Sequence, residues 1–148
     1  MDIAQIVEAQ VKEGRDASDI IACEVATPVR QAVGLLAEKR IGALPVTEGG
    51  RVVGIISERD VIYRLADEGE SCLSLQVGQI MTAPAISVEP STPVNDALGL
   101  MTRRRIRHLP VIENGALVAF ISIGDLVKTR IDEVEHEAEA MRSYIQTA

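Results

Sequence analysis

Aromatic residues, cysteines and histidines are scarce in this chain of 148 residues. Aromatic side chains make up 2% of the sequence, too few to stack on the bases of a single-stranded nucleic acid. The two cysteines, Cys23 and Cys72, do not form a CxxC motif, and two histidines add too few ligands for a zinc site. We therefore expect no bound metal and no recognition of nucleic acid by stacking.

Catalytic motifs are missing as well. His108 and His136 do not belong to a recurring pattern with a serine or cysteine nucleophile. The segment "EGGR", residues 48–51, lacks the GxxxxGK[ST] pattern of a phosphate-binding P-loop. The expectation is a protein that is not an enzyme and needs no catalytic cofactor.

Basic residues are fewer than acidic ones, 15 against 22, and the net charge is -7. An overall negative field argues against a nucleic-acid partner. No apolar run approaches the length of a membrane span, and the amphipathic start "MDIAQIVEAQVKEG" contains acidic residues, unlike a signal peptide. These features predict a cytoplasmic protein with reduced thiols and no membrane attachment.

An internal repeat organises the chain, in which 47% of residues are hydrophobic. Residues 27–62, shifted by 65 positions, fall on residues 92–127 without a gap, and nearly half of the positions are identical. One unit of about sixty residues therefore occurs twice, and such a repeat decides the architecture.

Each unit is expected to run strand, helix, strand, strand, helix, an α/β arrangement. Thr-Pro at 27–28 and 92–93 predicts two helix starts, with the threonine as N-cap and the proline in the first helical position. Apolar residues then recur at helical spacing. They are Val29, Ala32, Val33 and Leu36 in the first unit, and Val94, Ala97, Leu98 and Met101 in the second.

The strands are predicted from short apolar runs bounded by turns. The proline of "ALPV" and "HLPV" suits an edge strand or a strand start, and the glycines of "EGGR" and "ENGA" suit hairpin turns. The expected strands are 21–24, 43–46 and 52–56, and then 85–88, 108–111 and 117–121. The expected division of the chain is an N-terminal helix at 1–19, a first unit at 20–68, a linker at 69–80, a second unit at 81–130 and a helical extension at 131–148.

The helix that follows Asp125 is expected to continue to about Ile145, with apolar residues spaced alternately by four and three. These residues are Val127, Ile131, Val134, Ala138, Met141 and Ile145. The row could pack on its own unit or on another copy of the chain. We favour a homodimer contact, because the residues between them are too charged to be buried on other faces.

The same Ser-x-x-Asp corner ends the last strand of both units, as Ser57 with Asp60 and as Ser122 with Asp125. One interpretation is a capping box, in which the serine oxygen and the acid satisfy the first N–H groups of the helix. The other is a binding site, because a helix N-terminus attracts phosphate and a serine hydroxyl can add a donor.

The repeated "LPV" strand and "G-h-h-S-x-x-D" corner, in "IGALPV…GGRVVGIISERDVI" and "IRHLPVIENGALVAFISIGDLV", resemble the CBS domain. Two in tandem look like a CBS pair, or Bateman module, of the small stand-alone bacterial kind. The resemblance covers roughly residues 20 to 130. It implies two units around a pseudo-two-fold axis with two clefts that bind AMP, ADP, ATP, NAD(H) or S-adenosylmethionine, and association of two modules into a dimer.

The resemblance also implies roles for particular residues. Asp60 and Asp125 would bind the ribose hydroxyls. Ser57 and Ser122 are the candidates for the phosphates from their place at a helix start, and Arg59 belongs to the first corner. Arg107 and His108 would face the phosphates across the cleft, although a surface imidazole is an equal alternative for His108. The candidate adenine slot is formed by Ile21, Ile41, Met81, Thr82, Ile86 and Ile106, for which ordinary core packing is the alternative.

The two sites are not expected to be equal. Gly42 and Ala43 occupy the places of Arg107 and His108 in the first repeat, and Gly124 occupies that of Arg59 in the second. The resulting hypothesis is a regulatory sensor of adenine nucleotides that signals to an unidentified partner protein. The alternative is a protein-interaction or dimerisation module whose corners are only helix caps.

Overall fold

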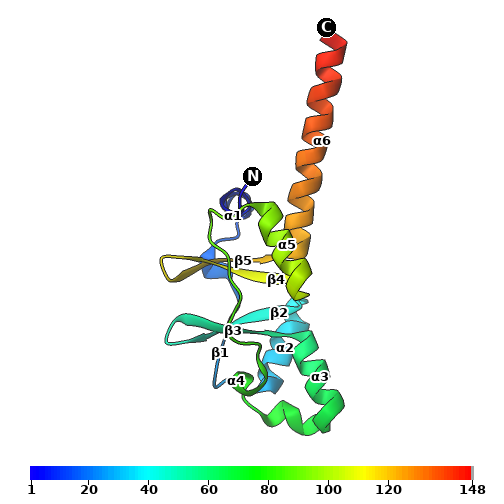
Figure 1. Cartoon of the computed structure of the whole chain (residues 1–148). Coiled ribbons are helices and arrows are strands. Elements are labelled where there is room, and N and C mark those ends of the chain that lie inside the picture. Colours follow the sequence, from blue (N-terminus) through cyan, green and yellow to red (C-terminus); the bar gives the residue numbers. More distant parts are fainter. Residues whose placement is uncertain (148) are drawn as a thin grey trace.

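The computed structural model describes residues 1–147 as two stacked α/β units from which one long helix projects (Figure 1). The first unit contains β1 (Cys23–Glu24), α2 (Val29–Lys39), β2 (Ala43–Glu48), β3 (Arg51–Ser57) and α3 (Glu58–Glu68). The second contains α5 (Val94–Arg104), β4 (His108–Glu113), β5 (Ala116–Ser122) and α6 (Ile123–Thr147). Outside these units lie α1 (Ile3–Lys12), α4 (Val77–Ile80) and two short 3₁₀ helices, Ala17–Asp19 and Gly69–Ser74.

Each unit has its own small sheet. In the first sheet β1 runs parallel to β2, and β2 runs antiparallel to β3. In the second, β4 and β5 form an antiparallel hairpin, and Val88 alone bridges to Val111 in parallel. The strand expected at 85–88 is therefore reduced to one bridge, and the strand expected at 21–24 forms only over its last two residues.

Both hairpins turn through two residues with positive φ, as a tight hairpin of the favoured hand requires. Gly49 and Gly50 have φ of 60° and 80°, and Asn114 and Gly115 have φ of 51° and 80°. The two sheets therefore share one turn geometry, although asparagine replaces a glycine in the second.

The expectation for Pro45 is wrong, because β2 is the central strand of its sheet and Pro45 is the third residue of that strand. Pro45 pairs with Ile55, whose own N–H donates to Thr82 on the side away from β2. On the other side β1 pairs only from Val46 onward. The missing N–H of the proline consequently removes no bond from either ladder.

Both helix starts lie one residue later than expected. Pro28 and Pro93 are the N-caps, and helices α2 and α5 begin at Val29 and Val94. The threonine before each proline instead closes the preceding turn. The hydroxyl of Thr27 accepts from the N–H of Glu24 at 3.0 Å, and that of Thr92 accepts from the N–H of Glu89 at 3.1 Å.

Two separate cores correspond to the two units, and short helices are exchanged between them. Ile3 and Ile6 of α1 are buried in the core of the second unit, whereas Val77 and Ile80 of α4 are buried in that of the first. The expected apolar rows of α2 and α5 also enter these cores. Each exchanged helix lies across the start of the helix that it covers, through bridges Asp2–Pro93 and Gln76–Pro28. The exchange ties the two units together.

Helix α6 starts on the second unit and extends well beyond it (Figure 1). Its expected apolar row does not pack on the chain's own units: side chains of Val127, Ile131, Val134, Met141 and Ile145 are 42% to 69% exposed. Within residues 1–147, no helix combines the length and the apolar character that a membrane crossing needs.

Candidate ligand-binding site

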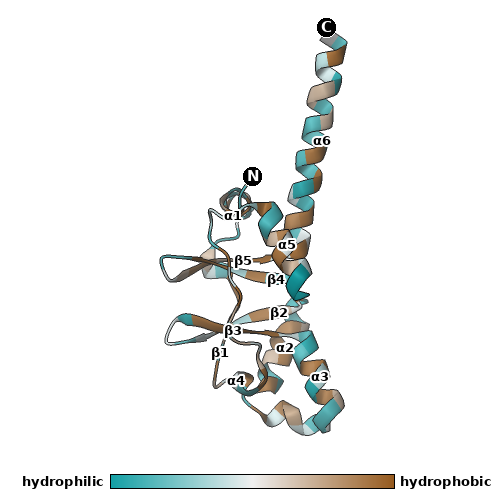
Figure 2. Cartoon of the chain, viewed as in Figure 1, coloured by the Kyte–Doolittle hydropathy of each residue, from teal (hydrophilic) through white to brown (hydrophobic). Residues whose placement is uncertain are grey.

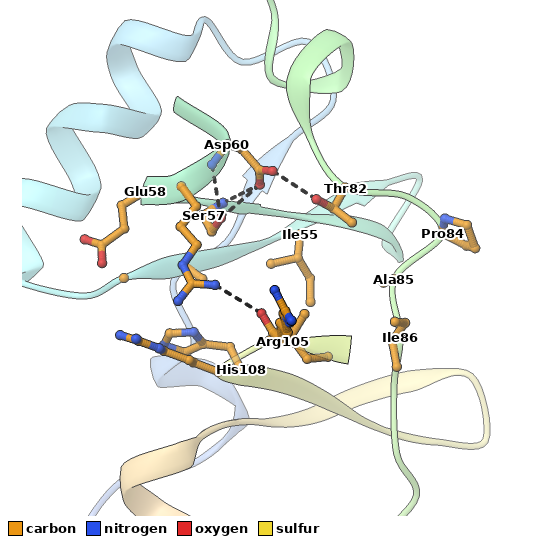
Figure 3. Close-up of a pocket in the computed structure, with 15 residues that line it drawn as sticks. Ile55, Ser57, Glu58, Asp60, Thr82, Pro84, Ala85, Ile86, Arg105 and His108 are labelled. Carbon is orange, nitrogen blue, oxygen red and sulfur yellow. Dashed lines mark hydrogen bonds between the residues drawn. The ribbon is translucent and has the colours of Figure 1, made fainter. Parts of the chain in front are cut away.

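Two clefts lie between the units, and each combines the Ser-x-x-Asp corner of one unit with residues of the other. The first cleft joins the corner at Ser57 to Ile86 and to Arg105–His108 (Figure 3). The second joins the corner at Ser122 to the segments around Ile21 and Ile41, and it is the larger of the two.

The corner of the first cleft forms a complete capping box at the start of α3. Ser57 donates its N–H to Oδ2 of Asp60 at 2.8 Å, and its hydroxyl donates to the same oxygen at 3.1 Å. The N–H of Asp60 donates back to the hydroxyl at 3.3 Å, and that of Glu58 donates to the carbonyl of Gly42 at 3.0 Å. The first amides of the helix are thus largely engaged within the protein.

Asp60 also joins the start of the second unit to the corner. Its Oδ1 accepts from the hydroxyl of Thr82 at 3.0 Å (Figure 3), and Thr82 exchanges two backbone hydrogen bonds with Ile55. A carboxylate has about four acceptor positions, of which Asp60 uses three within the protein. Asp60 and Thr82 both line the first cleft, so a hydroxyl of a ligand can donate to the remaining acceptor position.

Gly54 is required where residues 81–82 cross β3. A Cβ at this position would lie 2.6 Å from Sδ of Met81 and 2.8 Å from the carbonyl oxygen of Thr82. Met81 packs against the first core and lines neither cleft. The structure therefore assigns Met81 to packing, which was the stated alternative to the adenine slot.

Positive charge gathers at the first cleft from both units. Nη1 of Arg59 donates to the backbone carbonyl of Arg105 at 3.2 Å, so this side chain spans the gap between the units. Arg105 adopts a left-handed conformation with φ of 55° as the C-cap of α5. Arg107 follows on the same wall. These guanidinium groups can meet an anionic part of a ligand.

His108 borders both clefts. Its ring stacks on Phe120 at a centroid distance of 5.6 Å, and its Cε1 lies 3.3 Å from where a Cβ on Gly42 would be. Burial lowers the pKa of His108 below its usual 6.5, against the opposing effects of Glu58 and Asp125. Burial therefore disfavours the charged imidazole, and the ring forms part of the wall of each cleft.

The second corner repeats the capping geometry but is covered by the N-terminal segment. Oδ2 of Asp125 accepts from the N–H of Ser122 at 2.9 Å and from Nε2 of Gln10 at 3.4 Å. Nη2 of Arg15 lies 3.7 Å from the other carboxylate oxygen. Outside its own capping box, Asp125 contacts Gln10 and Arg15, whereas Asp60 contacts Thr82. The two corners therefore differ in partners that the repeated sequence does not reveal.

The remaining candidates for an adenine slot do not form one group. Thr82, Ile86 and Ile106 line the first cleft, whereas Ile21 and Ile41 line the second. Residues of equal position in the repeat fall on opposite clefts because each unit supplies its corner to one cleft and its isoleucines to the other. The isoleucines are half-buried at the cleft surface, so they serve both packing and cleft lining.

Several lining residues were not identified from the sequence. In the first cleft they include Ile55, Pro84 and Arg105, and in the second Gln10, Arg15 and Asp19. The amphipathic start of the chain predicted a helix but carried no signal for the unit that it would cover. Among residues 1–147, no group of three or more potential metal-binding side chains comes together.

Comparison with known proteins identifies the family. The CBS domain model matches residues 16–67 and 77–132, which are the two repeats. This chain belongs to the CBS-domain family. It is a tandem CBS pair.

Relatives of similar organisation support this assignment. The chain is 33% identical to a crystal structure of a CBS-domain protein from Agrobacterium tumefaciens, with a TM-score of 0.79, covering 88% of this chain and 99% of the other. It is 38% identical over 129 residues to the mitochondrial CBS domain-containing protein CBSX3 of Arabidopsis thaliana, covering 84% of this chain. This chain spans 63% of the length of CBSX3.

Inosine-5'-monophosphate dehydrogenase of Mycobacterium tuberculosis is 34% identical over 128 residues. The match spans 84% of this CBS pair but only 23% of the enzyme, so it does not extend the enzyme's activity to this chain.

Two CBS pairs of the same fold have been determined with ligands. CBSX2 in complex with AMP is 22% identical with a TM-score of 0.72. The CBS pair of protein MJ0100, in complex with 5-methylthioadenosine and S-adenosyl-L-methionine, is 20% identical with a TM-score of 0.73.

Proposed function

We propose that this CBS pair is a regulatory sensor that binds an adenine nucleotide, such as AMP, ADP, ATP or NAD(H), and signals its presence to a partner protein. The supporting observation is the composition of the first cleft. The Ser57–Asp60 corner of one unit faces Ile86 and Ile106 of the other, and arginines from both units border the space. Apolar walls beside a carboxylate and cations suit a base, a ribose and a phosphate in one ligand.

The proposed roles follow from chemistry at each position. Asp60 accepts hydrogen bonds from the ribose hydroxyls, one of which replaces Thr82, and Ile86 and Ile106 enclose the base. Arg59 and Arg107 bind the phosphate. Ser57 acts mainly through the cap that orients Asp60, because its hydroxyl already donates there at 3.1 Å. The adenosine-containing ligands of CBSX2 and MJ0100 support this class of ligand.

We propose further that the first cleft is the stronger site. Asp125 is occupied by Gln10 and Arg15, so a ligand in the second cleft must displace these side chains before Ser122 and Asp125 can act. A ligand alters the arrangement of the units only if it binds one arrangement more tightly than another. A bound phosphate would replace the carbonyl of Arg105 as the hydrogen-bond acceptor of Arg59, and so would break this contact between the units.

Calorimetric titration with AMP, ADP, ATP, NAD, NADH and S-adenosylmethionine tests the proposal, with Asp60→Ala as the site variant. We expect one nucleotide to bind with a dissociation constant below 1 mM, on the order of the weakest affinity useful to a sensor, and Asp60→Ala to abolish binding. Asp67→Ala, an exposed aspartate on the same helix α3, is the matched control and should bind normally. Binding that survives in Asp60→Ala would contradict the ribose assignment.

A second candidate is a protein-interaction or dimerisation module without a physiological ligand. The capping boxes favour it, because they satisfy both corners without any ligand. This alternative is selected if none of the six compounds gives a heat signal and none raises the melting temperature.

We propose no catalytic role, because the candidate residues bind and orient but include no activated nucleophile. Nucleotide recovered after incubation with the protein should be chemically unchanged by chromatography. We also propose a cytoplasmic location, consistent with the two buried free thiols of Cys23 and Cys72, which cell fractionation would test.

A further inference from the structure

The exposed apolar row of α6 needs a covering surface. We call it the tail seam, defined as Val127, Ile131, Val134, Ala138, Met141 and Ile145. Its five larger side chains are 42% to 69% exposed, and the outer part of the helix projects beyond both units as alternating apolar and polar segments (Figure 2). Leu126 and the second core lie at the base of the helix and leave this row uncovered.

The width of the tail seam indicates how many helices it joins. Its residues occupy two positions per heptad, and charged residues stand directly beside them. A helix in a larger bundle adds a third apolar position per heptad, whereas a strict two-position row is typical of a two-stranded coiled coil. The pattern therefore fits one partner helix.

The flanking charges match a second copy of the same helix. With the seam at the a and d positions, Lys128, Glu135 and Arg142 take the e positions, and Arg130, Glu137 and Tyr144 take the g positions. In a parallel pair each g residue faces the e residue five positions later on the other helix. Arg130 then meets the partner's Glu135, and Glu137 meets the partner's Arg142, so both pairs attract.

An antiparallel pair reverses this outcome. It would place Lys128 beside the partner's Arg142, Glu135 beside the partner's Glu135, and Glu137 beside the partner's Glu137. All three contacts repel. The only ion pair of α6 that would have to open in the parallel pair, among those the structure describes, is Arg130–Glu133, an exposed contact within the helix at 3.1 Å.

We infer that α6 binds a second copy of this chain as a parallel, in-register, two-stranded coiled coil along the tail seam. The two second units then lie together at the base of the coil. Because α6 begins at the Ser122–Asp125 corner, the coil leaves the protein directly from the second cleft. This inference does not depend on nucleotide binding, so it can be tested separately from the proposed function.

Disulfide trapping tests the orientation in the full chain. In a parallel pair the Ile145→Cys thiols face each other and should cross-link rapidly under mild oxidation. In an antiparallel pair they lie about 27 Å apart, the rise of eighteen helical residues, and cannot bridge. Ser143→Cys, two positions away and off the seam, is the matched control, and the native Cys23 and Cys72 are buried. Failure of Ile145→Cys to cross-link, or equal cross-linking by Ser143→Cys, would overturn the inference.

Charge reversal tests the same arrangement without cysteine chemistry. Arg142→Glu should weaken dimerisation in sedimentation equilibrium by about tenfold, because two attractions become repulsions. The double variant Glu137→Arg/Arg142→Glu should restore the native dissociation constant. An antiparallel pair predicts tighter association of Arg142→Glu, since it would then face the partner's Lys128. That result, a monomeric native chain, or a mass of three or more copies would each overturn the inference.

Discussion

Nε2 of Gln10 on α1 donates a hydrogen bond to Oδ2 of Asp125 on α6, at 3.4 Å and across 115 positions of the sequence. Gln10 is 9% exposed, so the contact closes one side of the second cleft. Asp60, the counterpart of Asp125 in the first unit, accepts instead from Thr82, at the start of the second unit. Two corners with the same sequence pattern thus have different hydrogen-bond partners.

Gln10→Ala should lower the free energy of unfolding by about 1.5 kcal/mol, because a partly buried hydrogen bond to a charged group is lost. Arg15→Ala, whose ion pair with Asp125 is longer and exposed, should cost less than about 0.5 kcal/mol. Urea denaturation measures both. Arg30→Ala is the control, because its pair with Glu70 is a surface contact at 4.0 Å. Equal small losses for all three variants would show that Gln10 does not hold α1 in place.

Gly54→Ala should destabilise the protein by about 2 kcal/mol, because the added methyl group meets the backbone oxygen of Thr82 as well as Met81. Gly34→Ala, in helix α2 with open space around its Cβ position, should instead stabilise by about 0.5 to 1 kcal/mol. Thermal unfolding measures both effects: the melting temperature should fall for Gly54→Ala and rise for Gly34→Ala. A neutral Gly54→Ala would mean that residues 81–82 can move away from β3.

Ser57→Ala and Ser122→Ala should each cost about 1 kcal/mol, because each removes the N-cap oxygen that accepts from the amide of the aspartate three residues on. Denaturant unfolding compares them. In the same variants, nucleotide binding should weaken in Ser57→Ala, where the cap orients Asp60, and change little in Ser122→Ala. A loss confined to Ser122→Ala would place the stronger site in the second cleft.

His108 makes stability depend on pH, because burial lowers its pKa in the folded protein below 6.5. Above that value the imidazole is neutral in both states. As the pH falls through 6.5 and then through the lower folded pKa, the unfolded state gains the proton first, so folding stability is lost. His108→Gln should remove this part of the decline below pH 6.5 when the free energy of unfolding is measured against pH.

His136→Gln is the control for that experiment, because His136 is exposed on α6. Identical slopes for His108→Gln and the native chain would show that the imidazole is not buried in solution.

Several elements were predictable because local chemistry decides them. The two-residue turns at Gly49–Gly50 and Asn114–Gly115 follow from residues that tolerate positive φ, and the capping boxes follow from the Ser-x-x-Asp spacing. The continuous helix from Ile123 to Thr147 follows from its heptad spacing and lack of breakers. The start of α2 was misplaced by one residue because Thr27 could cap either a helix or the preceding turn, and only the position of the chain in space chooses between them.

The sequence by itself determined the repeat, the order of elements in each unit, and the residues available at both corners. Their side-chain chemistry and spacing act over a few positions and need no distant contact. Only the tertiary structure decided that α1 crosses to the second unit, that Gln10 and Arg15 reach Asp125, and that the isoleucines divide between two clefts. These relationships depend on which apolar face covers which core, and an amphipathic helix such as α1 satisfies its own periodicity equally well on either unit.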